Sequence, residues 1–493
     1  MTLPSWKDNK RRYLSILGGF LIHIMIGTFY LWGNINVYVT SHLRNNGSNV
    51  TIDDMNSTFP FSGMAMGLFT PFGKIIADKV GNKRTMIICT ICFASCSLLA
   101  SFQTTFLSFS ITYGFAAGMF AGIIYLIPYY FAYSNFPNNK GFASGVISAG
   151  FGLSTFIFSW LCYFVINPNN LKPIFNPNTH ENYFSKEVSN RVPYMLRILS
   201  GLFLFLGTLG CFLQNLPEEN EIQQQERGES IKIKIDDQAS FINQYNGINE
   251  CKDIKSGLRT PVVYLTMILI LFYGAQGNFI IDNFQPIGQQ IGNFSDFYLT
   301  IVGSLGSIFN GFIRLIWGRA LDKYCFKKLA YLNLSIEFVC MIIFQYCVQY
   351  KSLYIISVLL MLGCFGGWSA KMPAVIAKVY GKDIGSTFYG ITVQGQAMGC
   401  WLQFFIVKYL RVNFGWNNIF YIYSGIIAIA AILTYFANFH INWNEFYAKR
   451  QSLKEDLIIE KSLYNNGEEE VLKIDLIKKL SINQEDEMKK QRQ

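Results

Sequence analysis

Charged side chains and histidines are scarce in this sequence. Asp, Glu, Lys and Arg supply 15% of its 493 residues, whereas about a quarter is usual in a soluble protein. Most of the chain is therefore expected in a lipid bilayer. The 4 histidines are scattered and form no H-E-x-x-H or other catalytic or metal-binding motif. We expect neither an enzyme nor a metal or other cofactor.

Long soluble domains are also lacking. The net charge of +10 is not gathered in a basic, aromatic-rich soluble domain, so nucleic-acid binding is not predicted. A receptor or sensor built on a carrier fold would be expected to add a long signalling domain, and the chain after the last apolar run is short. No cleavable signal peptide is evident, because the residues before the first apolar run end in Lys10, Arg11 and Arg12.

Long apolar runs are what the sequence has in abundance. A transmembrane helix needs about 20 predominantly apolar residues, and the chain contains about twelve such runs. Their approximate bounds are 13–40, 56–77, 85–102, 106–134, 141–166, 194–214, 260–284, 297–321, 328–348, 352–379, 385–410 and 416–440. The predicted fold is an all-α membrane protein of about twelve transmembrane helices in two six-helix halves.

Loop composition divides the chain further. Cations are concentrated in alternate loops, as an even number of spans with both termini in the cytosol requires. The predicted parts are a cytosolic N-terminus (1–12), an N-terminal half (13–214), a cytosolic linker (215–259), a C-terminal half (260–440) and a cytosolic tail (441–493). The plasma membrane is the default location, and an organelle membrane is equally compatible. We expect the monomer to be the functional unit.

Arg314 is the most informative residue, because it lies inside an apolar segment. A lone guanidinium in hydrocarbon costs at least about 3 kcal/mol, so it should face a protein interior or a water-filled cavity. Its natural ligand there is an anion. The alternatives are an ion pair with a protein carboxylate, or a side chain that extends to the cytosolic edge. The first nearby carboxylate is Asp322, which favours an anion-binding site.

Two similar charged turns occur six spans apart. The first runs from Gly73 to Arg84 and contains Asp78 and Lys79; the second runs from Gly318 to Lys328 and contains Asp322 and Lys323. A carboxylate at a helix end beside cations can hold two spans together on the cytosolic face. Such a contact can latch one conformation of a carrier and release it when the halves move. We therefore predict gating roles for Asp78, Lys79, Arg84, Asp322 and Lys323.

The repeated turn resembles the signature of major facilitator superfamily transporters. Asp78 and Asp322 match its acidic position and Gly318 its leading glycine, whereas the first copy has Lys74 where the glycine is expected. A narrower resemblance is to the oxalate/formate antiporter family. It rests on the run from Gly27 to Trp32, on the glycines and prolines of spans four and five, and on Asn310, Gly311, Arg314, Trp317 and Gly318.

The resemblance implies that Arg314 binds a substrate carboxylate. In the oxalate/formate family a lysine of span eleven binds the second carboxylate of a dicarboxylate, and Gln396 occupies that position here. An amide can form hydrogen bonds to a carboxylate but does not neutralise it. A monocarboxylate such as pyruvate, lactate or formate is therefore favoured. Lys371, at similar depth in span ten, is either a second substrate cation or a residue of the cytosolic gate.

Aromatic and polar residues of the other spans complete the expected cavity. Their rings exclude water and their hydroxyl or N–H groups can orient a carboxylate. The candidates are Tyr30, Tyr125, Trp368, Tyr389 and Gln276. For proton coupling, the titratable candidates are Asp282 and His23; Glu337 is also within a span, but the resemblance places span nine at the periphery, where structural pairing is expected. Anion exchange needs none of these residues.

The sequence thus predicts a secondary active transporter of small organic anions that works by alternating access, with a monocarboxylate as substrate. The substrate, the lipid bilayer and, for symport, protons are its expected partners. A dicarboxylate (oxalate)/formate exchanger is the first alternative. A carrier of sugars or other neutral solutes is a weaker one, because a neutral substrate does not need a buried arginine.

Overall fold

The structure is a computed structural model that describes residues 6–177, 179, 181–216, 251–437, 439, 441–443 and 445–447. The described residues up to Phe439 belong to one compact unit, and residues 441–447 belong to a second one. Most of the predicted linker and tail lies outside the described residues, so the division of the chain into five parts stays a prediction.

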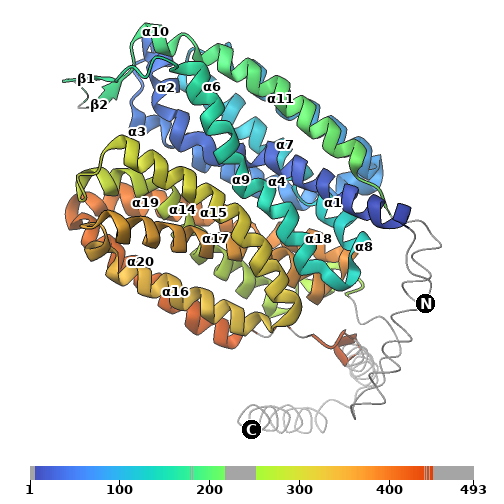
Figure 1. Ribbon diagram of the computed structural model, residues 1–493. Helices are drawn as coiled ribbons and strands as arrows, with labels where there is room; N and C mark the ends of the chain where they lie inside the picture. The colour runs from blue at the N-terminus through green and yellow to red at the C-terminus, as the bar shows by residue number, and fades with distance from the viewer. Residues whose placement is uncertain are drawn as a thin grey trace, which may run out of the picture. The chain divides into compact units, whose positions relative to one another are not determined.

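Long helices dominate the N-terminal part of the first unit (Figure 1). The first span combines α1 (Trp6–Ile26), the 3-10 helix η1 (Gly27–Leu31) and α2 (Trp32–Asn45). The next five spans are α4 (Thr58–Val80), α5 (Asn82–Ala100), the run of α6 (Phe106–Phe109), η2 (Ser110–Ala116), α7 (Ala117–Tyr125) and α8 (Ile127–Asn135), then α9 (Lys140–Ile166) and α11 (Val192–Leu213). The short elements are α3 (Ile52–Met55), η3 (Pro137–Asn139), β1 (Ile174–Asn176), β2 (Glu181–Tyr183) and α10 (Lys186–Ser189).

Six further spans follow the short helix α13 (Ile254–Gly257). They are α14 (Pro261–Gln290), α15 (Asp296–Lys323), α16 (Phe326–Cys347), α17 (Lys351–Tyr380), the run of α18 (Lys382–Thr392), α19 (Gln394–Phe405) and η4 (Ile406–Leu410), and α20 (Arg411–Phe436). Gly415 interrupts α20 with a φ of 70°, a value that glycine adopts without steric cost. The prediction of about twelve membrane helices in two sets of six is confirmed.

Ten of the described spans are long and apolar enough to cross a membrane by length and composition alone. The other two are α4, which has three charged residues in its last two turns, and the α18–α19 run, which contains three glutamines. These two spans pack against each other, and Gln394 of α19 donates a hydrogen bond to the Gly67 carbonyl of α4. Gln394 therefore finds a protein partner where lipid would offer none.

The two sets of six helices meet along a seam. Its first side is the packing of α9 on α15, and its second is the packing of α4 on α18 and α19. Glycines permit the close approach of α9 and α15: a Cβ atom added to Gly145 would lie 2.7 Å from the Arg314 backbone oxygen, and one added to Gly318 would meet the Gly141 backbone oxygen. Small residues serve the same purpose at helix contacts in membranes generally. The seam brings Arg314 of α15 directly against α9.

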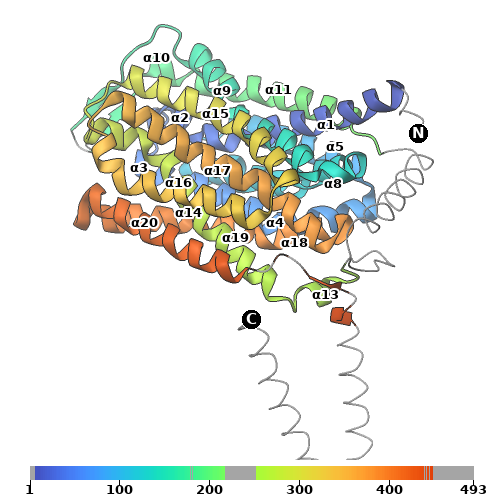
Figure 2. The ribbon, with the colours of Figure 1, turned by 60° about the horizontal axis from the view of Figure 1, so that its bottom comes forward.

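The two ends of the helices differ in their connections (Figure 2). One end, here called the hairpin end, carries α3, α10 and the antiparallel pair β1–β2, in which Phe175 faces Asn182. The opposite end, the charged-turn end, carries the turns after α4 and α15 and the neighbouring α8 and α18 (Figures 1 and 2).

Candidate functional site

Arg314 is fully enclosed at the seam, with 1% of its surface exposed. Its Nε donates to the Asn310 Oδ1, 3.0 Å away and one turn earlier in α15. Its Nη1 donates to the Ser148 carbonyl oxygen of α9 at 2.9 Å. Asn310 is itself held by a hydrogen bond from its Nδ2 to the Leu362 carbonyl oxygen of α17 at 2.9 Å. One guanidinium thus joins helices of both halves.

The third donor group of this guanidinium is unused. The Nη2 of Arg314 is buried without a hydrogen-bond partner. Among the described residues the ion pairs are Lys74–Asp78 and Lys378–Asp322, so no described carboxylate pairs with Arg314. A buried cation that lacks a counterion is strongly destabilising. The buried, unpaired Arg314 fits a site whose counterion is a ligand. A bound carboxylate would neutralise the positive charge and accept hydrogen bonds from the free N–H groups.

Aromatic side chains from both halves form a cluster within electrostatic reach of this guanidinium. The Arg314 cluster consists of Arg314 and the residues His23, Tyr30, Tyr125, Tyr129, Tyr273 and Tyr389. All of these except Tyr389 lie within electrostatic reach of the guanidinium. The His23 ring centroid is 5.1 Å from those of Tyr125 and Tyr129. Tyr389 of α18 stacks on Tyr125 of α7 at 6.3 Å, across the seam.

The structure therefore brings four of the predicted substrate-binding residues together: Arg314, Tyr30, Tyr125 and Tyr389. Tyr273 belongs to the same cluster but was not singled out from the sequence. It precedes Gln276 by three residues in α14, a spacing that places two side chains on one helix face, and this spacing was the signal that could have identified it.

The two predicted glutamines lie on α14 and α19. Gln276 is 1% exposed, and neither its amide oxygen nor its amide nitrogen has a hydrogen-bond partner. The Oε1 of Gln396 is also buried without a partner. It lies against α14, since a Cβ atom added to Gly274 would be 2.7 Å from it. Buried amides with free donors and acceptors can bind a polar ligand between these two helices.

Lys371 and Trp368 occupy a different place, inside the C-terminal half. The Lys371 Nζ lies 4.2 Å from the Trp317 ring centroid and 4.5 Å from that of Trp368. It donates to the Leu329 carbonyl oxygen at 3.4 Å and interacts electrostatically with Glu337. These contacts of Lys371 come from α15, α16 and α17, not from the Arg314 cluster. Trp368 does reach that cluster, because it stacks on Tyr273 at 5.5 Å.

The two predicted coupling residues also differ in position. His23 is completely buried in the Arg314 cluster, with Nδ1 3.0 Å from the Gly19 carbonyl oxygen and Nε2 without a partner. The Asp282 carboxylate of α14 accepts a 2.6 Å hydrogen bond from the Gln403 amide of α19. Tyr30 lies within electrostatic reach of both Asp282 and Arg314.

The predicted gating residues differ in their contacts and in their exposure. Asp322 accepts hydrogen bonds from the backbone N–H groups of Gly141 and Phe142 at 2.9 and 2.8 Å, at the N-terminus of α9, and lies 3.5 Å from the Lys378 Nζ. A carboxylate is stabilised at a helix N-terminus, and here it joins the two halves. Asp78 instead pairs at 2.5 Å with Lys74 of its own helix and is exposed. The remaining gating candidates are exposed: Lys79, Arg84 and Lys323.

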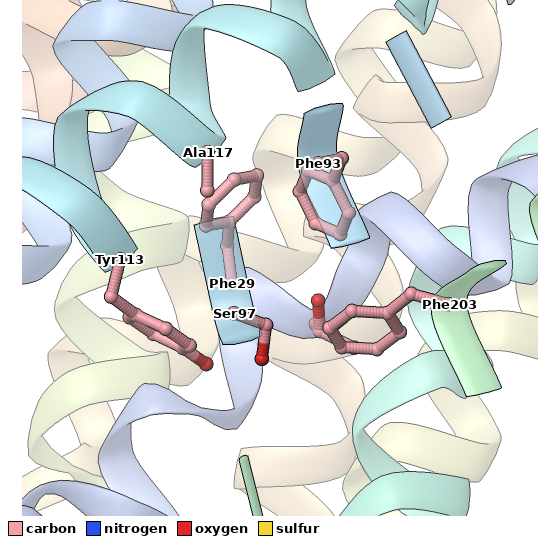
Figure 3. A pocket seen from close by; sticks show the side chains of 7 residues that line it. Phe29, Phe93, Ser97, Tyr113, Ala117 and Phe203 are labelled. Carbon is pink, nitrogen blue, oxygen red and sulfur yellow. The ribbon is translucent and has the colours of Figure 1, made fainter. Parts of the chain in front are cut away.

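Neither a small internal cavity nor a cluster of metal-binding side chains provides another site among the described residues. A cavity of about 10 Å³ lies inside the N-terminal half, beside Phe29, Ser97 and Tyr113 (Figure 3). That volume is about enough for one water molecule and too small for a carboxylate. Among the described residues, no group of three or more His, Cys, Asp or Glu side chains is placed to hold a metal ion.

Twelve membrane helices in two packed sets, with an enclosed polar site at their seam, define a secondary transporter. Residues 16–403 match the Major Facilitator Superfamily, and the chain belongs to this family. The solved proton:xylose symporter XylE has a similar fold, with a TM-score of 0.61 at 13% identity over 87% of this chain and 96% of that one. That similarity concerns the fold alone.

Two curated relatives are carriers of organic anions by name. The chain is 24% identical to the apicoplast pyruvate carrier 1 of Toxoplasma gondii over 454 residues, covering 79% of this chain and 82% of that protein. It is also 24% identical to the oxalate:formate antiporter of Oxalobacter formigenes over 420 residues, covering 84% and 88%. The predicted resemblance to the oxalate/formate family is thus confirmed, and the family's proteins are transporters rather than enzymes.

The Asp322 contact can be tested by amide exchange. Replacing Asp322 by Asn removes the negative charge at the N-terminus of α9, an interaction that contributes about 1–2 kcal/mol in a partly buried position. We expect hydrogen exchange at Gly141 and Phe142 to accelerate by about 5- to 30-fold, the factor that corresponds to this free energy. Asp78→Asn is the control, because its exposed pair within α4 contributes only about 0.3–0.5 kcal/mol. Equal exchange rates in the Asp322 variant and the wild type would refute the proposal that Asp322 holds the two halves together.

Proposed function

We propose that this protein carries small monocarboxylates, of the pyruvate, lactate or formate type, across a membrane by alternating access. The observation that carries the proposal is the free Nη2 donor of Arg314, buried with no carboxylate paired to it among the described residues. A carboxylate is a planar anion that accepts the guanidinium hydrogen bonds in a defined geometry. The named substrates of the two relatives, pyruvate and oxalate or formate, belong to the same chemical class.

Charge decides between one carboxylate and two. Arg314 is the permanently charged residue of its cluster. Lys371 instead interacts with Glu337 inside the C-terminal half. Gln396 contributes an uncharged amide. One cation neutralises one carboxylate, and a second carboxylate enclosed without a cation would be costly. This balance supports a monocarboxylate.

The main alternative is an oxalate and formate exchanger. The relative from Oxalobacter formigenes and the presence of Lys371 in the C-terminal half support it. A sugar carrier is less well supported, since a neutral sugar would leave the Arg314 charge unbalanced.

Alternating access would use the seam as its moving part. The contacts across it at the charged-turn end, above all those of Asp322 with α9, form the proposed gate. We propose that they break when the halves rock, which exposes the Arg314 cluster to the other side. Both halves that form the seam belong to one polypeptide chain, so the proposed movement needs no second copy, and we propose the monomer as the functional unit.

The membrane and the orientation are part of the proposal as well. We place the charged-turn end in the cytosol because of its cations, and with it both termini. The plasma membrane is the default assignment; an organelle membrane is the alternative, and the Toxoplasma gondii relative is named for one.

Removal of the Arg314 charge tests the substrate class. The measurement is counterflow of labelled pyruvate into proteoliposomes loaded with unlabelled substrate. We expect Arg314→Ala to weaken this counterflow by about 100-fold or more, which corresponds to about 2.8 kcal/mol. The expected size follows because hydrogen bonds to charged groups each contribute about 1.5–3 kcal/mol. Arg319→Ala, an exposed position on the same helix, should transport like the wild type. Uptake of labelled glucose without uptake of any carboxylate by the wild type would refute the proposal.

Adding a cation at position 396 tests the charge balance. Gln396→Lys should shift the preference from pyruvate toward oxalate by about 10-fold, because a second carboxylate then meets a second positive charge. The measurement is competition of each unlabelled acid against labelled substrate. Gln396→Met removes the amide without adding charge and should not favour oxalate. An unchanged preference in the lysine variant would place residue 396 outside the substrate site.

Proton coupling can be tested at Asp282. If uptake of labelled pyruvate rises with an inward proton gradient, Asp282→Asn should abolish that dependence while exchange of internal for external pyruvate continues, because the amide cannot carry a proton. Asp54→Asn, exposed near the hairpin end, should keep the gradient dependence. Wild-type uptake that ignores the gradient would assign the protein to anion exchange and leave Asp282 with a structural role.

A further inference from the structure

A lysine and a glutamate are buried on neighbouring helices of the C-terminal half. Lys371 of α17 is 0% exposed and Glu337 of α16 is 1% exposed. Both lie in membrane-spanning helices, where ionisable side chains are costly and usually have a function. The proposed transport mechanism uses neither residue. Their surroundings therefore need an explanation of their own.

The surroundings of the pair form a closed assembly within the C-terminal half. The Lys371 ammonium contacts the faces of Trp317 and Trp368 and donates to the Leu329 carbonyl oxygen. The Glu337 carboxylate accepts a hydrogen bond from the Trp368 Nε1 at 3.1 Å. The titratable groups that act on the ammonium are Glu337 of α16 and Cys364 of α17 itself. Glu337 is thus the carboxylate that acts on Lys371, although the two do not form one of the ion pairs between described residues, and the ammonium is directed at groups of α15, α16 and α17.

Trp368 connects this assembly to the proposed substrate site. Its indole interacts with Lys371 and Glu337, and it also stacks on Tyr273 with an interplanar angle of 9°. Tyr273 in turn lies within electrostatic reach of Arg314, Tyr30 and Tyr125. Two aromatic contacts, Lys371–Trp368 and Trp368–Tyr273, therefore connect the buried ammonium to the Arg314 cluster.

We propose that Glu337 and Trp368 hold Lys371 out of the substrate site, and that this sequestration sets the preference for one carboxylate over two. The inference rests on the proposed function and adds a specificity device to it. Lysine has a flexible four-carbon stem and a compact charge, so its ammonium can change direction once its counterion is removed. The second carboxylate of a dicarboxylate bound to Arg314 would then attract the Lys371 ammonium in place of Glu337.

The test is the preference between oxalate and pyruvate in Glu337→Gln. Glutamine retains an oxygen that can accept the Trp368 N–H but loses the charge that balances Lys371. We expect pyruvate counterflow to persist and the ratio of half-saturation concentrations, pyruvate over oxalate, to rise by at least about 10-fold, which corresponds to about 1.4 kcal/mol. An unchanged ratio would overturn the proposal.

A double variant identifies the cation responsible. Glu337→Gln combined with Lys371→Met removes both charges and leaves no cation to be released, so its ratio should stay at the wild-type value. A gain of oxalate in the double variant equal to that in Glu337→Gln would overturn the role of Lys371. A merely structural role for Glu337 would alter pyruvate and oxalate uptake alike and leave the ratio unchanged.

A second route covers the case in which Glu337→Gln does not fold. Trp368→Phe keeps both charges but removes the indole N–H that holds Glu337, and it should also raise the ratio, by a smaller factor. A wild-type ratio in this variant would then refute the inference. Failure of the proposed function is seen separately, as a wild type that carries no carboxylate or an Arg314→Ala variant that still carries pyruvate normally.

Discussion

The structure depends on a buried guanidinium that is bound from both halves of the protein. Arg314 is part of α15, yet one of its two hydrogen bonds goes to the backbone of α9 and the other to Asn310, which is fixed by α17. Its remaining donor has no partner. A closed seam around an unbalanced charge is less stable than the same seam around a balanced one. A bound anion would therefore favour closure, and a carrier can turn over when loaded states interconvert more easily than empty ones.

Close packing at the seam allows Arg314 to form a hydrogen bond with the opposite half. The glycines of α9 and α15 bring the two backbones so close that a guanidinium on one helix reaches a carbonyl of the other. The same proximity lets Asp322 reach the first N–H groups of α9. The related residue Asp78 pairs with Lys74 of its own helix. The two charged turns thus have a similar sequence but make different contacts. At the charged-turn end, the aspartate contact between the two halves lies on the side of α9 and α15.

Physical reasons explain what the sequence could and could not predict. Span number follows from the length of apolar runs, and the burial of Arg314 follows from its apolar neighbours, so both were predictable. The π-helical segments η2 and η4 leave no such mark, because they change hydrogen bonding without changing composition. Tyr273 was missed because a tyrosine in an aromatic-rich span does not stand out. Asp322 was expected in a gate, but its partner, a helix N-terminus far along the chain, depends on the tertiary fold.

Lys371 shows a deeper limit of reasoning from sequence. A rise of about 1.5 Å per residue gives its depth in the membrane, and at that depth it could face either the substrate or the helices behind it. The direction depends on Trp368, one turn earlier in α17, and also on Glu337 of α16 and Trp317 of α15, and no local pattern connects the residues of α15 and α16 to Lys371. The number of cations in the membrane spans is therefore not the number of charges that a substrate meets. Selectivity for one or two carboxylates depends on which cations already have a protein counterion.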